Sequence, residues 1–309
     1  MIELAPVRTL PPLPSSVLAG RIPKWRLDRL VHRPCPACDA DEPSTICRRP
    51  DHLAVARCGS CRMTYLPEIP EDEDLAAFYR HYGEYKELRP AKVSWIRKLL
   101  PIRSPDPFIE LLENSGGLSG RRLCEVGCSF GTFLSRARDR GARVFGVELD
   151  EGALDHLGRH GIPASKTFDA SAEFDIVCAF QLIEHLARPS QFLGQTSRLL
   201  RSDGRLLLAV PNGGEGEKVG PAWVGYRVDL EHLNYFSVGS LSQLLSRYNL
   251  YVEHFWEYYQ PNIPRRNGPV KPRPGWKQKA TELLRKLQCD PYRGSGTFVL
   301  CVLARKAES

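Results

Sequence analysis

From residue 121 onward, strand-like apolar runs alternate with helix-like segments, and this alternation constrains the fold more than any other feature of the chain. The runs FDIVCAF (174–180) and GRLLLAV (204–210) are mainly apolar, as is typical of strands that are covered on both faces. We expect a helix between them that ends at Gly204, and another that begins after Asp150, a good N-cap residue. Strands alternating with helices of about a dozen residues predict a doubly wound α/β domain with a mostly parallel sheet.

Two Cys-x-x-Cys pairs, CPAC (35–38) and CGSC (58–61), precede that region. Small residues between the cysteines allow two sulfurs of each pair to face one ion, and four thiolates at this spacing fit tetrahedral Zn²⁺. A closed four-sulfur site has no open position, so the predicted role of the metal is structural. The predicted zinc ligands are Cys35, Cys38, Cys58 and Cys61.

The rest of the chain divides by composition. Prolines are frequent before residue 30, and Gly116 and Gly117 mark the start of the alternating region. Between these limits, the acidic run 71–74 precedes LAAFYRHY and favours a helix start, because carboxylates stabilise the positive end of the helix dipole. The predicted parts are a Pro-rich arm (1–30), a zinc ribbon (31–70), a helical linker or substrate cap (71–115) and the α/β core (116–309), which contains a basic insert (260–294).

The stretch CEVGCSFGTFL (124–134) connects a predicted strand to a predicted helix through a turn of small residues. Glycines let a backbone approach a ligand, and a helix that starts at Gly131 offers free N–H groups. The pattern is not G-x-G-x-x-G, since Ser129 stands where a middle glycine is expected. Cys124 and Cys128 should point apart and are not expected to form a redox pair. Alone, the turn predicts either a nucleotide site or a helix-packing contact.

Four motifs in order and spacing resemble the class I S-adenosylmethionine-dependent methyltransferases: EVGCSFGTFL, GVELD, FDIVCAFQLIEHL and GRLLLAVPN. The resemblance implies a Rossmann-like sheet of seven mostly parallel strands. It also implies S-adenosylmethionine as cofactor, with its methionine part on the glycine turn and its ribose on the acidic residue after the second strand. The residues assigned to the cofactor in this way are Glu125, Gly127, Cys128, Ser129, Gly131, Glu148, Leu149, Asp169 (with Phe168 as the other candidate for the adenine), Phe180 and Gln181.

The combination of CPAC, CGSCRMTYLP and FYRHY ahead of this core is similar to a bacterial group of zinc-ribbon methyltransferases. That group includes the sugar C-methyltransferases of deoxysugar biosynthesis, and the core also resembles the ubiquinone-pathway O-methyltransferases. The sugar enzymes continue with a further C-terminal domain, whereas this chain stops at residue 309. O-methylation of a sugar hydroxyl or a similar small molecule therefore fits the shorter form as well.

Methyl transfer requires the acceptor to be aligned with the methyl group and usually to lose a proton, which histidine can accept near neutral pH. The segment DLEHLNYFS (229–237) follows the fifth strand and has a Glu-His-x-x-Tyr pattern similar to that of the sugar C-methyltransferases. The resemblance implies His232 as the general base, supported by Glu231, with His185 and Tyr235 as further catalytic candidates. The alternative is that these side chains only cap helices or bind backbone carbonyls.

The positive charge of the chain is local. Residues 261–294 contain nine Lys or Arg and two acidic residues, a net charge of +7 that equals that of the whole chain. This segment could attract an anionic substrate such as a nucleotide sugar, or contact a membrane beside a lipid-linked glycan through an amphipathic helix at 276–287. It could also bind RNA phosphates, or be an ordinary solvated surface.

The predicted function is S-adenosylmethionine-dependent methyl transfer to a small molecule, namely a sugar or a glycan precursor. An RNA methyltransferase that uses the ribbon and the basic insert is the alternative, and no DNA partner is expected. A non-catalytic scaffold is disfavoured because Gly127, Gly131 and Glu148 are all present. The N-terminus lacks the charged-then-apolar order of a signal peptide, so a cytoplasmic protein is expected.

Overall fold

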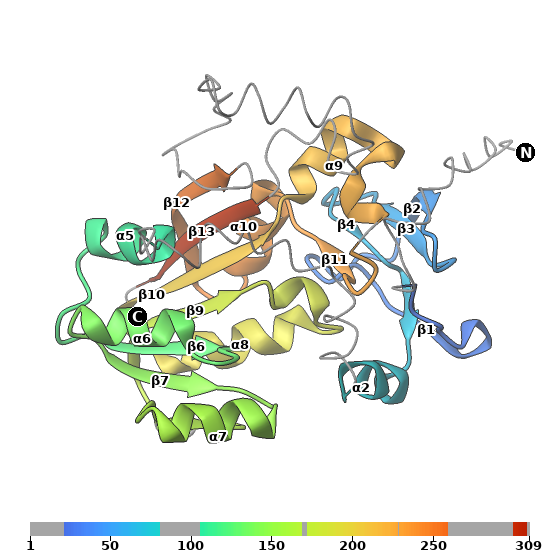
Figure 1. Cartoon of the computed structure of the whole chain (residues 1–309). Coiled ribbons are helices and arrows are strands. Elements are labelled where there is room, and N and C mark those ends of the chain that lie inside the picture. The colour runs from blue at the N-terminus through green and yellow to red at the C-terminus, as the bar shows by residue number, and fades with distance from the viewer. Residues whose placement is uncertain (1–21, 81–105, 169–171, 228, 259–298, 308–309) are drawn as a thin grey trace, which may run out of the picture.

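The computed structural model describes residues 22–80, 106–168, 172–227, 229–258 and 299–307 (Figure 1). Several predictions concern parts of the chain outside these ranges: the arm before residue 22, the cap segment 81–105, Asp169, and the basic insert 260–294 with its helix at 276–287.

A seven-stranded sheet forms the centre of the core, in the order β12-β13-β10-β9-β6-β7-β8. Among the described strands of this sheet, β13 runs in the opposite direction to the other six. The chain passes from β6 outward to β7 and β8, and then crosses to β9 on the other side of β6, so the direction of strand order reverses between β6 and β9. This confirms the doubly wound, mostly parallel sheet and makes the carboxyl ends of these two strands the expected ligand crevice. The strands are β6 (Arg122–Val126), β7 (Arg143–Val147), β8 (Ala164–Ser165), β9 (Phe174–Phe180), β10 (Leu200–Pro211), β12 (Leu250–Tyr258) and β13 (Val299–Lys306).

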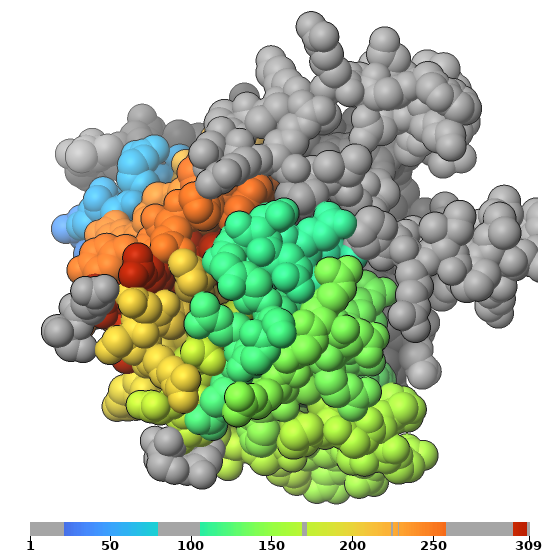
Figure 2. Space-filling model, turned by 90° about the vertical axis from the view of Figure 1, so that its left-hand side faces the viewer, coloured from blue at the N-terminus to red at the C-terminus, as the bar shows by residue number. Residues whose placement is uncertain are grey.

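Helices cover both faces of this sheet because its central strands are apolar on both sides. In β10, Leu206 and Leu208 pack in the cluster that contains α8 and α10, whereas Leu207 packs in the cluster that contains α5, α6 and α7. Successive side chains of a strand point to opposite faces, so neither face can be left in water. Figure 2 shows the molecule from the left-hand side of Figure 1, with the green segments of residues 106–160 beside the yellow, orange and red segments of later residues. The helices are α5 (Pro107–Asn114), α6 (Thr132–Asp139), α7 (Glu151–Arg159), α8 (Pro189–Leu199) and α10 (Val238–Ser246).

Local signals located most of these elements, with one error. Asp150 is the N-cap of α7 as expected, and its carboxylate accepts a hydrogen bond from the N–H of Ala153. The predicted helix end at Gly204 is wrong, because α8 already ends at Leu199 and Leu200 begins β10 by pairing with Phe174. Both leucines are buried. In the sequence this apolar pair looks like part of one more helical turn, but Leu199 ends the helix and Leu200 begins the strand.

The N-terminal ribbon has two small sheets and is joined to the core. In the larger sheet the order is β11-β4-β3-β2, and β11 comes from far along the chain, with Asn234 paired to Tyr65 and Tyr235 paired to Thr64. No local pattern in the sequence indicates this added strand. Figure 1 accordingly shows the blue ribbon strands beside β11 and α9. The elements are η1 (Leu27–Arg29), β1 (Leu30–His32), β2 (Pro43–Arg48), β3 (Ala54–Cys58), β4 (Thr64–Tyr65), β5 (Glu68–Pro70), α2 (Asp72–Arg80), η2 (Ile183–His185), α9 (Gly213–Val219), η3 (Gly220–Ala222), η4 (Val224–Tyr226) and β11 (Asn234–Tyr235).

No helix within the described residues combines the length and the apolar character that crossing a bilayer requires.

Candidate functional site

The turn between β6 and α6 lies at the carboxyl end of β6, where the strand order reverses. Gly127, Ser129 and Gly131 have φ angles of 72°, 48° and 70°, in the left-handed region that favours glycine. The N–H of Gly127 donates to the carbonyl of Val147 at 2.8 Å, which ties the turn to the end of β7. A Cβ atom at Gly131 would collide with the side chain of Leu157 on α7. The turn therefore makes a helix-packing contact while its first glycine stays open to a ligand.

Glu148 follows β7 and lies against this turn. Its Oε2 accepts a hydrogen bond from the N–H of Ser129 at 2.7 Å, and its Oε1 accepts from the N–H of Leu149 at 2.7 Å. The N–H of Asp150 also donates to Oε1, at 3.1 Å. A carboxylate has about four lone-pair sites, so three backbone donors leave about one site for a hydroxyl donor of a ligand. Glu148 thus has the position and the remaining acceptor capacity that a ribose site needs.

A cavity of about 400 Å³ opens beside these residues. Three of the residues assigned to the cofactor, Gly127, Glu148 and Leu149, line it, and so does Phe168, the other candidate for the adenine. The opposite wall was not predicted; it includes Gln191 and Gln195, which are four residues apart on α8 and therefore on one face of that helix. Both glutamines are exposed, as is Arg198 on the next turn, so in the sequence they look like an ordinary solvated helix face and gave no signal for this wall. The complete lining is Val126, Gly127, Val147, Glu148, Leu149, Phe168, Leu182, Leu186, Ala187, Arg188, Gln191, Phe192 and Gln195.

Other residues assigned to the cofactor do not line this cavity. Glu125 is buried in β6, and its burial, together with the charges of Asp106 and Glu148, raises its pKa well above the usual value. The side chain of Cys128 is buried too, which raises the pKa of its thiol to about 12. Cys128 is therefore a packing residue of the apolar cluster around α6.

Phe180 and Gln181 lie at the end of β9, on the far side of the glycine turn from Glu148. Phe180 stacks on Phe108 with ring centroids 4.4 Å apart. The N–H of Gln181 donates to the carbonyl of Ala209 at 2.7 Å, while its side chain is exposed. These two residues border the crevice on its β9 side, whereas Glu148 borders it on the β7 side.

Two of the predicted catalytic residues come together although they are distant in sequence. The rings of His185, in η2, and His232 have centroids 4.8 Å apart and meet edge to face. Tyr79 of α2 packs on the other side of His185, with centroids 6.1 Å apart. Since η2 lies between Leu182 and Leu186, which line the cavity, the histidine pair is adjacent to the cavity.

The other two predicted catalytic residues are buried. Tyr235 is 1% exposed, and its hydroxyl accepts a hydrogen bond from Arg49 Nη1 at 2.9 Å, so the side chain belongs to the ribbon interface. Glu231 is 2% exposed. Sequence reasoning gave Glu184 no catalytic role, but its carboxylate and one ring nitrogen of each histidine lie within 4.8 Å of one another.

The four predicted zinc ligands converge. The sulfurs of Cys35 and Cys61 are 3.4 Å apart, and those of Cys38 and Cys58 are 3.6 Å apart. Zn–S bonds of about 2.3 Å in a tetrahedron put sulfurs ~3.8 Å apart, so the set is close to the required size. The turns of the two Cys-x-x-Cys pairs also have the same backbone pattern. The N–H of Asp39 donates to the carbonyl of Cys35, the N–H of Arg62 donates to the carbonyl of Cys58, and the φ angles of Asp39 and Arg62 are 62° and 64°.

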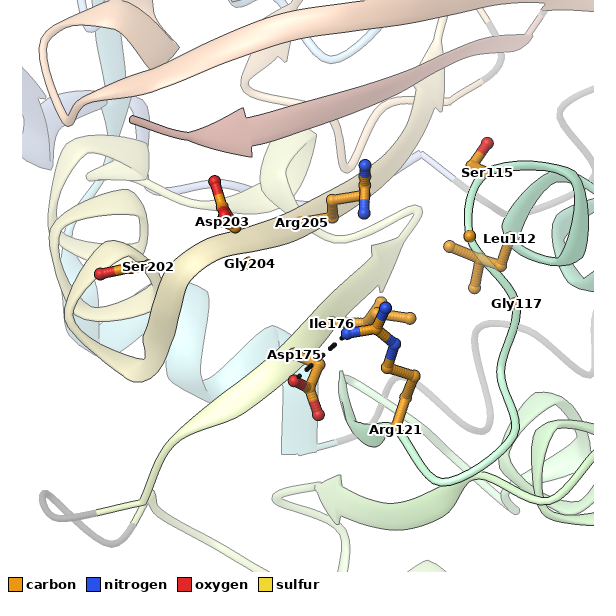
Figure 3. A pocket seen from close by; sticks show the side chains of 11 residues that line it. Leu112, Ser115, Gly117, Arg121, Asp175, Ile176, Ser202, Asp203, Gly204 and Arg205 are labelled. Carbon is orange, nitrogen blue, oxygen red and sulfur yellow. Dashed lines mark ion pairs between the residues drawn. The ribbon is translucent and has the colours of Figure 1, made fainter. Parts of the chain in front are cut away.

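A second cavity, of about 50 Å³, lies at the opposite edge of the sheet, near the start of β9 (Figure 3). Arg121 points toward Asp175 across this cavity, with 3.7 Å between Nη1 and Oδ1. Arg205, also on its wall, pairs with Glu253 at 2.9 Å. The volume is enough for one or two water molecules, and these charges are already paired, so this cavity is not a substrate site.

Comparisons with known proteins agree with this geometry. A family model described as "Methyltransferase domain" matches residues 88–255, more than half of the chain. The ubiquinone biosynthesis O-methyltransferase of Hahella chejuensis is 25% identical over 159 residues, covering 48% of this chain and 62% of that protein. That of Idiomarina loihiensis is 27% identical over 142 residues, covering 42% and 54%. The chain thus spans less than two thirds of the length of these curated relatives.

Solved structures show the same fold. The structure of a Burkholderia thailandensis 1,6-didemethyltoxoflavin-N1-methyltransferase, with 1,6-didemethyltoxoflavin and S-adenosylhomocysteine bound, covers 86% of this chain and 100% of that chain. Its TM-score is 0.50 and its sequence identity 14%, so the likeness concerns the fold alone.

The burial of Glu184 leads to a prediction about stability. The side chain is 0% exposed, neither oxygen accepts a hydrogen bond from another described residue, and burial raises its pKa well above the usual value. With the folded pKa above the unfolded value of about 4.3, the stability associated with the neutral carboxyl is fully present below that value and is lost as the pH rises through the folded pKa. Glu184→Gln should therefore gain unfolding free energy over wild type between pH 4.5 and pH 8, by about 1.4 kcal/mol for each pKa unit crossed.

Urea unfolding at the two pH values measures this difference. Glu68→Gln, at an exposed position of β5, is the control and should show no such gain. An equal effect of Glu184→Gln at both pH values would show that the carboxyl has the same pKa folded and unfolded.

Proposed function

Because the chain belongs to the methyltransferase-domain family, we propose that it transfers a methyl group from S-adenosylmethionine to a small molecule. The observation that carries the proposal is the 400 Å³ cavity at the reversal of strand order, lined by Gly127 and Glu148 and adjacent to the pair His185 and His232. A nucleotide-type turn on one side and two titratable imidazoles on the other are what a methyl donor and a proton acceptor require.

The residues on the cavity wall fit S-adenosylmethionine. Gly127 lets the main chain approach the methionine part, Glu148 can accept the ribose hydroxyls, and Leu149 and Phe168 offer apolar surface to the adenine. Leu149 is 76% exposed, which is costly for a large apolar side chain and would be relieved by a bound base. The cofactor supplies an electrophilic methyl group on sulfonium, and the chain aligns the acceptor and takes its proton.

We assign the proton transfer to His232, with Glu231 beside it in sequence. His232 is 5% exposed and packs edge to face on His185, so its ring is held in place beside η2. A fixed ring is favourable for a general base, because proton transfer needs hydrogen-bond distance to the acceptor. His185 completes the wall on which the acceptor would rest.

Burial also supports a small acceptor. A side chain as buried as His232 is reached by a sugar-sized molecule, whereas RNA would have to extrude a nucleotide first. Together with the resemblance of the ribbon and core to sugar methyltransferases, this favours a sugar or glycan precursor as substrate. We further propose that Cys35, Cys38, Cys58 and Cys61 bind a structural Zn²⁺, on the basis of the converging sulfurs.

The cofactor assignment predicts the effect of Glu148→Ala. Loss of hydrogen bonds from ribose hydroxyls to a carboxylate, at about 1.5–3 kcal/mol each, should weaken S-adenosylhomocysteine binding at least about tenfold. Isothermal titration calorimetry measures the dissociation constant. Glu151→Ala, three residues along and 81% exposed, is the matched control and should bind as wild type does. An unchanged dissociation constant in Glu148→Ala would remove Glu148 from the site.

The base assignment predicts that His232→Ala lowers kcat by about 10²–10⁴-fold, with cofactor affinity nearly unchanged. The exposed His160, at the end of α7, gives the control His160→Ala, which should keep wild-type kcat. Single-turnover transfer from saturating S-adenosylmethionine separates the chemical step from binding. Full turnover by His232→Ala would refute the assignment.

The substrate class can be tested with methyl-labelled S-adenosylmethionine and a host lysate divided into nucleotide-sugar, lipid and RNA fractions. We expect label in the nucleotide-sugar or the lipid fraction, and none with His232→Ala. Label confined to RNA would contradict the substrate class while leaving methyl transfer intact.

A further inference from the structure

Arg49 of the ribbon is bonded to the backbone of the segment that carries His232. Its guanidinium is 0% exposed, and Nη1 donates to the carbonyl of His232 at 2.5 Å while Nη2 donates to that of Leu230 at 2.6 Å. The remaining donors bind the Tyr235 hydroxyl and both oxygens of Asp51. A guanidinium has five N–H groups, so each donor of Arg49 has a hydrogen-bond acceptor. No other side chain type could make this set of bonds.

Asp51 holds Arg49 in turn. Its two oxygens bind the Arg49 fork, and Oδ2 also accepts a hydrogen bond from Trp25 Nε1 at 2.9 Å. Both side chains of the ion pair are 0% exposed. A buried pair of this kind is held firmly only when its other hydrogen bonds are satisfied, as they are here. Arg49 is thus a fixed point of the ribbon, and the carbonyls that it binds are fixed with it.

Arg33 makes the corresponding contact with the second histidine segment. It is 8% exposed, and its Nη1 donates to the carbonyl of Ala187 at 2.8 Å, while Nη2 donates to that of Leu233 at 2.7 Å. Ala187 lines the cofactor cavity and lies two residues after His185. Burial lowers the pKa of Arg33 to about 10, so the side chain stays charged at neutral pH. One ribbon arginine therefore contacts both histidine-bearing segments.

Asn234 of β11 connects the two segments directly. Its side-chain amide donates to the carbonyl of Leu186 at 2.8 Å, and its Oδ1 accepts from Arg33 at 3.0 Å. The N–H of Leu233 donates to the carbonyl of Glu184 at 2.8 Å. The ribbon and this region also share one apolar core, in which Leu53, Val55 and Leu66 of the ribbon pack with Trp223, Tyr226, Leu233 and Tyr235.

From these contacts we infer that Arg49 and Arg33 are positioning residues for methyl transfer, through which the ribbon holds His232 and His185 beside the cofactor cavity. The inference rests on the proposed function. Both guanidinium groups donate their hydrogen bonds to backbone carbonyls and to neighbouring side chains. Neither arginine is therefore proposed to contact the substrate or the cofactor. The cofactor rim is different, because Gly127 and Glu148 are held by β6 and β7 without any ribbon contact among the bonds of the turn. Arg49 holds no residue of the cavity wall, whereas Arg33 holds Ala187, which lines the cavity. The Arg49 contact should therefore control turnover and leave cofactor binding unchanged.

The test compares Arg49→Lys and Arg33→Lys with Arg48→Lys. Lysine keeps the charge but has three donors and no planar fork, so it cannot hold two carbonyls and a hydroxyl in the same directions. Arg48 is the neighbouring exposed arginine, and its one described side-chain bond, to the carbonyl of His52, stays within the ribbon. We expect kcat to fall at least about tenfold in the first two variants. In Arg49→Lys, which alters no contact to the cavity wall, the dissociation constant of S-adenosylhomocysteine should stay within about twofold of wild type. Arg48→Lys should match wild type in both.

Amide hydrogen exchange supplies a readout that does not depend on turnover. Peptides covering 229–236 and 183–188 should exchange faster in Arg49→Lys and Arg33→Lys, while peptides covering 122–150 keep their wild-type rates. Faster exchange in all these peptides would indicate general destabilisation and overturn the inference. So would wild-type kcat and exchange in both variants.

Removal of the ribbon metal tests the same coupling from the other end. A chelator that strips metal from the four cysteines should reproduce the exchange pattern of Arg49→Lys and leave S-adenosylhomocysteine binding intact. Loss of cofactor binding on chelation would contradict the inference. If wild type transfers no methyl group to any fraction, the proposed function fails, and the exchange pattern alone decides whether the ribbon positions the histidines.

Discussion

The pairing of β11 with β4, reinforced by two buried arginines, is the contact on which the candidate site depends. Without it, the segment 229–236 would keep only its contacts within the core, such as the bond from the N–H of Leu233 to the carbonyl of Glu184, and His232 would be held less firmly. Burying two guanidinium groups is costly unless every donor is used, and Arg49 uses all five on fixed partners. The ribbon and this segment are therefore parts of one folded unit, whose shared core contains Trp223, Tyr226 and Tyr235.

The site consequently has two halves of different origin. The α/β core provides the first half, because the reversal of strand order between β6 and β9 opens a crevice. The rim of this crevice is formed by the left-handed turn at Gly127 and by Glu148, which follows β7. The ribbon provides the second half by holding η2 and the His232 segment. A methyl donor on one half and a proton acceptor on the other must be aligned to within a fraction of an ångström for transfer, so the joint between the halves is where turnover can be set.

How well a feature could be predicted from the sequence depends on how far apart in the chain its interacting residues lie. The parallel strands, the N-cap at Asp150 and the turn at Gly127 depend on patterns within a few residues, and the structure has them as expected. The boundary at Leu199 and Leu200 was placed wrongly, because a buried Leu-Leu pair suits a helix and a strand equally well. The added strand β11 and the roles of Arg33 and Arg49 depend on partners more than 150 residues away, and no local pattern marks an arginine that will be buried. His185 and His232 were each identified separately, but only the folded chain brings them together.

We propose that a nucleotide-linked methyl donor binds at the carboxyl ends of β6 and β7, next to the histidine pair. A crystal structure of the protein with S-adenosylhomocysteine tests this binding site. The ligand should show density in the 400 Å³ cavity, with its ribose at Glu148 and its homocysteine part at the Gly127 turn. Ligand density at another place on the chain, or an empty cavity at saturating ligand, would contradict it.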